Sequence, residues 1–168
     1  MPLSMYHASV PVFLQMLTAL SAVLAKAEAQ CRSEGRDPAE LVRARLAPDM
    51  FPLSRQVQIA TDHAKGAAAR LSGREVPKFE DNEASFEDLK DRIAKTITFV
   101  SSVEVGEIEG SEDREVTLTL RGQPRTFSGQ QYLLHLALPN FYFHVTTAYG
   151  ILRQNGIALG KTDFLGAS

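Results

Sequence analysis

The first twenty-five residues contain no Asp, Glu, Lys or Arg, and this charge-free start constrains what the chain can fold into. A helix that is apolar around most of its circumference has to be covered by lipid or by other helices. A secretory signal carries basic residues ahead of its apolar run, whereas here the first basic residue is Lys26. Polar residues such as Gln15 also interrupt the stretch of about twenty apolar residues that a spanning helix requires. We therefore expect a helix from about Ser4 to Cys31 at the centre of a bundle, with Pro11 near its start or at a kink.

Capping signals predict further helices along the chain. Asp37 before Pro38 indicates the start of a short helix that continues to about residue 46. Long helices are expected from about residue 52 to 71, from Ser85 to about residue 100, and from Ser128 to about residue 155. Each of these two serines has a capping-box residue three positions later, so each marks a helix start.

Residues 115 to 127 change from a helical period to a period of two. Val116, Leu118 and Leu120 alternate with polar residues, and the segment from Arg121 to Pro124 supplies a turn, so a β-hairpin is predicted. A lone hairpin is marginally stable in water, so it should lie on the helices or on another subunit. We expect a single domain over residues 1–168 that is an all-α, up-and-down four-helix bundle, with a short extra helix and a small β-hairpin before the last helix. We also expect a homodimer, in which one patch serves both subunits.

The charge balance and the single cysteine narrow the classes of partner. Eighteen basic residues against twenty acidic ones give a net charge of −2, which predicts no basic surface for nucleic acid or for an anionic membrane. Cys31 is the only cysteine, so no internal disulfide and no multi-cysteine zinc site can form. This pattern fits a reducing compartment, and we expect a cytoplasmic protein in which Cys31 is a buried structural thiol.

Two histidines fall on the inward faces of two different helices. A helix advances about 100° per residue, so Asn140 and Thr147 share the face of His144. The same arithmetic places Gln56 on the face of His63. Both faces are otherwise mostly apolar. The histidines are therefore either core residues bonded to a carbonyl or an amide, or members of a site between the two helices.

The sequence contains no motif that identifies a reaction. There is no HExxH, no serine on a nucleophile elbow and no glycine pattern of a phosphate loop. A zinc ion or a related transition ion needs at least three good donors, and the chain offers two clear ones in His63 and His144. A neutral amide such as Asn140 is a poor third ligand.

Several segments carry a resemblance to a known family. They are Arg45–Leu53, Leu138–Gly156 and the tail Gly160–Gly166. The last helix, in which His144 precedes a Leu-Arg pair and a terminal glycine, resembles the closing helix of the DinB/YfiT-like four-helix bundles. The whole chain is similar to an uncharacterised domain-of-unknown-function branch of that superfamily, and this branch brings no established activity with it.

The resemblance implies a divalent metal, held in the wider superfamily by one histidine from the second long helix and two from the last. Matched by position, these are His63, Asn140 and His144, so an asparagine stands where a histidine is expected. We expect zinc or nickel to be weakly held or absent, and a small molecule to be bound with help from Gln56 and Thr147. Because the superfamily includes thiol-dependent S-transferases, a divalent-metal-dependent transferase or hydrolase is one alternative. An assembly dimer without catalysis is the other.

Overall fold

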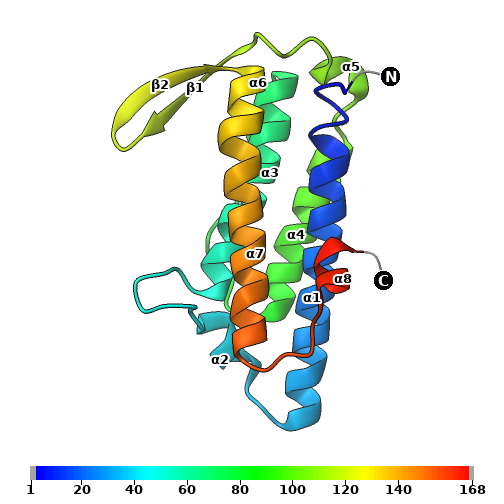
Figure 1. The fold of residues 1–168 in the computed structure, drawn as a ribbon, viewed down its shortest axis with the longest axis vertical. Helices are drawn as coiled ribbons and strands as arrows, with labels where there is room; N and C mark the ends of the chain where they lie inside the picture. The colour runs from blue at the N-terminus through cyan, green and yellow to red at the C-terminus, as the bar shows by residue number, and fades with distance from the viewer. Residues whose placement is uncertain (1–2, 167–168) are drawn as a thin grey trace.

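The computed structural model describes residues 3–166, and four long helices lie side by side in it (Figure 1). Their shared interior holds the apolar core, in which the rings of Phe13 and Phe141 meet edge to face at 5.0 Å between centroids. The chain is mostly helical, as predicted, with one small antiparallel sheet. The long helices are α1 (Val10–Glu34), α3 (Leu53–Ser72), α4 (Phe86–Ser101) and α7 (Leu138–Gln154).

Shorter elements connect the long helices. Asp37 caps α2 (Pro38–Arg43) through a 2.9 Å hydrogen bond that its carboxylate accepts from the Ala39 amide, as the sequence predicted. This helix ends before residue 46, because Ala44 takes an extended conformation. Where one short extra helix was expected, the structure has several. The others are α5 (Val105–Ile108), α6 (Gly129–Tyr132), the π-helical turn η1 (Leu133–Ala137) and α8 (Lys161–Leu165).

The apolar first helix is a core helix in this structure. It begins at Val10, so Pro11 lies in its first turn, where a missing N–H costs little. Length and composition alone would let α1 cross a membrane, but half of its most apolar stretch is buried inside the molecule, where α1 packs on α4 and α7. The Cys31 thiol is fully buried, and burial raises its pKa, as expected of a structural thiol.

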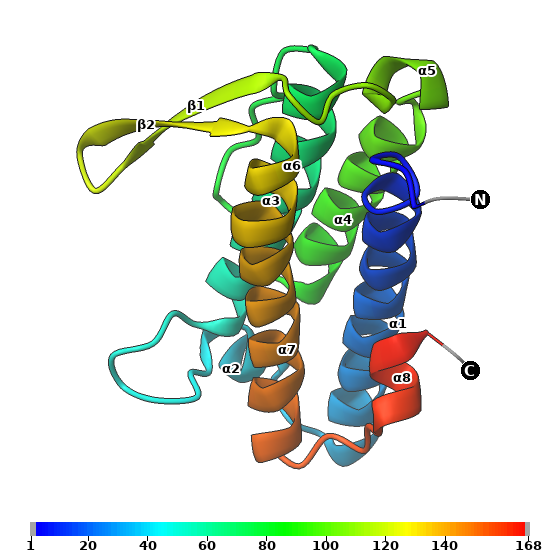
Figure 2. The same ribbon diagram turned by 45° about the horizontal axis from the view of Figure 1, so that its top comes forward.

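α3 and α4 run in the same direction, which corrects the predicted up-and-down order. Gln58, early in α3, donates a 2.8 Å hydrogen bond to Glu83 just before α4, while Arg74, just after α3, donates one to Ser102, just after α4. Both helices therefore end at the same end of the molecule (Figure 2). The connection between them, residues 73–85, is long enough to return along α3. Extended chain covers about 3.3 Å per residue, whereas a helix of twenty residues is about 30 Å long.

α7 runs antiparallel to α3, so the start of one helix lies beside the end of the other. Arg70, late in α3, bonds Tyr132 ahead of α7, while Gln56, early in α3, bonds His144 in the second half of the α6–α7 helix. Between these two contacts, His63 faces His144. We call this line of polar residues, Gln56, His63, Arg70, Tyr132 and His144, the α3–α7 seam.

The predicted hairpin is present as β1 (Glu115–Leu120) and β2 (Gln123–Ser128). Arg121 and Gly122 form its turn, both with positive φ, 52° and 77°, which is the conformation that a tight hairpin turn requires. Val116 is buried at the base of the hairpin, and the strands project away from the helices toward the turn (Figure 1).

The C-terminal segment folds back onto α1 and forms the short helix α8. The Asp163 carboxylate accepts a 2.8 Å hydrogen bond from the Gly160 amide and so starts this helix despite the flanking glycines. Phe164 docks against Tyr149, edge to face at 5.8 Å. Leu165 is 40% exposed, whereas Phe164 packs against the core.

Candidate functional site

A π-helical turn immediately precedes the part of α7 that carries the candidate site. In η1 the chain makes a wider turn, in which the Leu138 amide bonds the Leu133 carbonyl. Pro139 follows and lacks an N–H, and the wide turn accommodates it without breaking the helix. The side-chain amide of Asn140 donates a 2.7 Å hydrogen bond to the Leu136 carbonyl. The nitrogen of this amide is therefore committed to its own helix, and Oδ1 is the atom left for a ligand.

A chain of two hydrogen bonds fixes the orientation and the tautomer of His144. Gln56 donates from Nε2 to the Phe51 carbonyl at 3.0 Å, so its Oε1 is the acceptor at the other end of the amide. That oxygen lies 2.7 Å from Nδ1 of His144, which therefore carries the proton. Nε2 of His144 then holds a lone pair and can accept a hydrogen bond or bind a cation. Gln56, which the sequence placed near a ligand, thus contacts His144 directly.

The structure brings His63 and His144 together across two helices. Their rings are nearly parallel, with 13° between the planes and 6.1 Å between the centroids. His144 is buried and His63 is half-buried, so the pair lies at the edge of the core rather than in bulk solvent. Two imidazoles from separate helices therefore face one another at a single place.

Burial keeps both imidazoles uncharged at neutral pH. Loss of hydration lowers the pKa of His63 from 6.5 to about 4, and the nearby His144 and Arg70 act in the same direction, whereas Asp62 opposes them. Burial also lowers the pKa of His144, and the charge of Arg55 adds to the effect. The pair therefore presents neutral nitrogen atoms to anything that reaches it.

The donors around these imidazoles do not fit a tightly bound transition metal. Within residues 3–166, no group of three or more His, Cys, Asp or Glu side chains is placed to hold an ion. Asp62, the acid next to His63 in sequence, forms ion pairs with Lys65 and Arg92 instead. Asn140 supplies at most an amide oxygen, which is a weak ligand for zinc or nickel.

Thr147, the other residue expected near a ligand, is turned toward its own helix. Its hydroxyl donates a 2.7 Å hydrogen bond to the Phe143 carbonyl one turn earlier. Its side chain lines a shallow, mostly apolar groove on the outside of α7, together with Leu46 and Tyr142. The helix-face arithmetic placed Thr147 beside His144 but did not show which way its hydroxyl bonds.

The seam also contains a residue that the sequence analysis missed. Arg70 lies seven residues after His63, which lies seven residues after Gln56, so all three share one face of α3. The Arg70 guanidinium donates a 3.1 Å hydrogen bond to the hydroxyl of Tyr132, which is buried. The repeated spacing of seven was the signal that could have found this residue.

Gly66 makes room for the Arg70 guanidinium. A Cβ at position 66 would lie 2.5 Å from Nη1 of Arg70 and 3.9 Å from the hydroxyl oxygen of Tyr132. A side chain at this position would therefore push the guanidinium off the helix surface. Glycine inside a helix costs about 1 kcal/mol of helix stability relative to alanine. In return, the missing side chain lets the guanidinium lie against the helix backbone.

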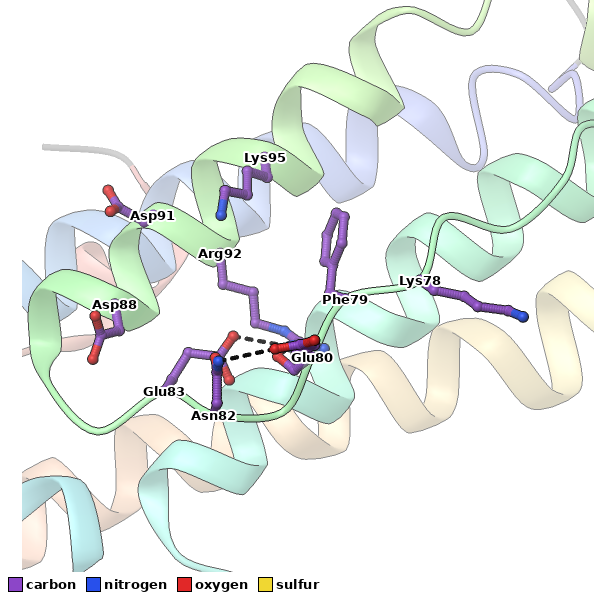
Figure 3. Close-up of a pocket in the computed structure, with 9 residues that line it drawn as sticks. All are labelled: Lys78, Phe79, Glu80, Asn82, Glu83, Asp88, Asp91, Arg92 and Lys95. Atoms are coloured by element: carbon purple, nitrogen blue, oxygen red, sulfur yellow. Dashed lines mark hydrogen bonds and ion pairs between the residues drawn. The ribbon is translucent and has the colours of Figure 1, made fainter.

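A second polar cluster, on the α4 side of α3, consists of paired charges. Arg92 of α4 is 2% exposed, and it bonds Thr61 at 2.7 Å and Asp62 at 2.9 Å, both on α3. It also pairs with Asp81 at 3.1 Å and with Glu83 at 3.0 Å, in the connection between the helices (Figure 3 shows the pair with Glu83). We call these five residues the Arg92 clamp. The clamp could not be found from the sequence, because Asp81 and Glu83 lie in a connection whose path was not predicted.

Comparison with known proteins agrees with this architecture. The family described as a domain of unknown function, DUF1993, matches residues 5–165. A solved structure, that of a DinB family member protein from Shewanella denitrificans, is 40% identical, with a TM-score of 0.88 over 97% of this chain and 92% of that chain. No protein of curated function matches the chain. The chain belongs to the DUF1993 family, a domain-of-unknown-function branch of the DinB-like superfamily, as its resemblance indicated.

Proposed function

We propose that the four long helices act as one bundle whose α3–α7 seam binds a small organic molecule through the uncharged imidazoles of His63 and His144. The observation that carries this proposal is the chain of hydrogen bonds from Phe51 through Gln56 to His144. A histidine that only fills the core needs one partner for its proton. Here the second nitrogen, Nε2, is left as an acceptor beside a second imidazole, so a suitable ligand carries a hydrogen-bond donor.

The low pKa values of the pair support this role. Because burial lowers the pKa of both His63 and His144, the acceptor stays available throughout the neutral pH range. A partly buried acceptor without a partner is unfavourable, and the donor of a bound ligand would relieve that cost.

A titration with neutral fragments tests the proposal. Benzyl alcohol and benzamide, each with one donor group, are added to ¹⁵N-labelled protein, and the ring signals of both histidines are followed by NMR. We expect saturable shifts at both rings, and a loss of binding in Gln56→Leu, where the His144 ring is free to turn. Gln123→Leu, on the exposed hairpin, is the matched control. Rings that do not respond, or unchanged binding in Gln56→Leu, contradict the proposal.

A divalent-metal-dependent transferase or hydrolase, similar to the thiol S-transferases of the superfamily, is the second candidate. The lone pair on Nε2 of His144, beside the ring of His63 at 6.1 Å, favours it. Asn140 in the third position argues for weak binding of zinc or nickel. Metal analysis of protein purified without a histidine tag separates the two candidates: stoichiometric metal supports the enzyme, and a metal-free preparation that binds fragments supports the first proposal.

Assembly into a homodimer is a separate proposal, supported by the hairpin. β1 and β2 pair only with each other in the described part of the chain, so each has an open edge, and the strands project from the helices (Figure 1). A second copy could cover these edges with the same surface. Light scattering at tens of micromolar protein should give about twice the 18.5 kDa mass of the chain, and a mass of 18.5 kDa contradicts the dimer.

A further inference from the structure

Resting on the proposed binding of a small molecule at the α3–α7 seam, we propose that this molecule is an organic carboxylate whose anionic group binds the guanidinium of Arg70. The two neutral imidazoles alone do not determine the class of the ligand, whereas Arg70 does. Three features favour a carboxylate: the partners of Arg70, the way its side chain is held, and the charge of the groove beside it.

Arg70 differs from Arg55 of α3 and from Arg92 of α4, which both pair with carboxylates. Arg55 pairs with Asp81 at 2.7 Å, and Arg92 is held among the carboxylates of its clamp. Within residues 3–166, no carboxylate oxygen lies within 4.0 Å of the Arg70 side-chain nitrogens. The protein therefore leaves the charge of a half-buried guanidinium unpaired, and an anionic ligand would supply the missing partner.

The guanidinium is also held in one place. It lies in the space that Gly66 leaves open, it bonds the hydroxyl of buried Tyr132, and its central carbon lies 5.8 Å from the centre of that ring. One of its five N–H donors is used in this way. The others form part of a planar fork that matches the two oxygens of a carboxylate. A donor group that is already positioned loses little entropy when it binds.

Arg70 lines a groove of about 490 Å³ between α3 and the connection that returns along it. Lys65 and Lys78 line the same groove, against two acids, Asp62 and Asp81. Both acids are also paired with Arg92, and Arg92 itself does not line the groove. Positive charge therefore predominates there, although the whole chain has a net charge of −2.

The rest of the groove suits the carbon skeleton of such a ligand. Pro77 and Phe79 form part of its wall, so an apolar body can lie beside the charged group. The groove and the imidazole pair are linked at Arg70, which shares the helix face of His63. A carboxylate with an aromatic or aliphatic body fits this combination better than an inorganic anion.

Benzoate and benzamide test the proposal, because they have nearly the same shape and differ in charge. Both are titrated into ¹⁵N-labelled protein at neutral pH, and the Nε–Hε signal of Arg70 is followed by NMR together with the ring signals of His63 and His144. We expect benzoate to bind at least tenfold more tightly than benzamide and to shift the Arg70 signal. Inorganic phosphate should bind more weakly than benzoate.

Three variants assign the effect to the guanidinium. Arg70→Met should remove the preference for benzoate, and Arg70→Lys, which keeps the charge but loses the fork, should reduce it. Gly66→Ala favours the helix, so it remains informative if Arg70→Met does not fold, and it should weaken benzoate binding by displacing the guanidinium. Arg125→Met, on the exposed hairpin, controls for the loss of one positive charge.

The outcomes separate this inference from the proposed function. Equal affinities for benzoate and benzamide, or a preference for benzoate that persists in both Arg70→Met and Gly66→Ala, overturn the carboxylate proposal. If benzamide binding still depends on Gln56 in that case, the proposed function stands without it. Benzoate binding that depends on Arg70 but not on Gln56 supports the anion site and counts against the proposed imidazole site. Absence of binding by both compounds overturns both proposals.

Discussion

The α3–α7 seam and the Arg92 clamp both lie along α3, and they treat polar groups in opposite ways. In the clamp, the guanidinium of Arg92 is buried and bonds a hydroxyl, a backbone carbonyl and three carboxylates. In the seam, each ring or guanidinium group keeps unused bonding capacity. Nε2 of His144 holds a free lone pair, and Arg70 is bonded to a single hydroxyl.

The difference separates the structural role of the clamp from the binding role that we propose for the seam. A network whose buried charges are all paired fixes the position of the chain, in this case the connection that lets α4 run parallel to α3. Groups that keep donors and acceptors free at the edge of the core have no such structural reason. The perturbed imidazoles, which meet across α3 and α7, and the unpaired guanidinium of Arg70 instead support the proposed binding of another molecule.

The largest expected effect is the loss of the clamp. Arg92→Met leaves Glu83, whose side chain is 8% exposed, and Asp62 without their buried partner, and breaking such an arrangement costs about 3–5 kcal/mol. Urea denaturation followed by circular dichroism measures this loss. Arg125→Met, on the exposed hairpin, should change the free energy of unfolding by less than about 0.5 kcal/mol. If Arg92→Met lowers the free energy of unfolding no more than this control does, the clamp does not hold the connection between α3 and α4.

Acid should weaken the seam through His63. Its pKa is about 4 in the folded protein and 6.5 ordinarily, so the unfolded chain takes up the proton first as the pH falls. The stability that neutral His63 contributes is present above pH 6.5 and is lost as the pH falls to about 4, by about 3 kcal/mol. Carboxylates also respond to acid, so the measurement is the difference between the parent and His63→Gln in urea unfolding across this range. Parallel curves for the two proteins would show that His63 is not protected from protonation.

Gln56→Leu should have a smaller effect on stability than on ligand binding. The change leaves the Phe51 carbonyl and the Nδ1 proton of His144 without their partner, which costs about 1–3 kcal/mol. Thermal unfolding measures the first effect and the fragment titration measures the second. A variant that is as stable as the parent and binds fragments equally well would remove the basis for distinguishing the seam from the clamp.

The smallest expected change in free energy follows from restoring a third imidazole. Asn140→His places a histidine one turn before His144 and should raise the affinity for zinc or nickel at least tenfold, which is about 1.4 kcal/mol. Calorimetric titration of metal into the tag-free variant and parent measures it. Equal affinities would indicate that the seam does not descend from a metal site.

Local signals in the sequence predicted the helices, their caps and the hairpin. Asp37, Ser85 and Ser128 each cap a helix as expected, because a cap depends on residues that are adjacent in the chain. The parallel direction of α4 could not be predicted in this way. It depends on the path of residues 73–85, which is set by contacts such as Gln58 with Glu83 that join distant positions.

In the candidate site too, local spacing predicted some features, and contacts between distant residues determined the others. Helix periodicity placed Gln56 beside His63 on one helix and His144 on the inward face of another, since each residue's face follows from spacing alone. The structure then showed that the two faces meet. Periodicity did not reveal that Arg70 reaches Tyr132, because that contact joins two distant segments and needs the space at Gly66. The hydroxyl of Thr147 bonds its own helix, which the face that it shares with His144 does not determine.

In the seam, Gln56 holds His144 as the neutral tautomer with its proton on Nδ1, so that Nε2 is a free acceptor. Long-range ¹H–¹⁵N NMR of ¹⁵N-histidine-labelled protein at pH 7 reports the protonation of each ring nitrogen directly. We expect a protonated Nδ1 and an unprotonated Nε2 at His144, and a loss of this fixed state in Gln56→Leu. A proton on Nε2 of His144 in the parent protein, or a doubly protonated ring at pH 7, would contradict it.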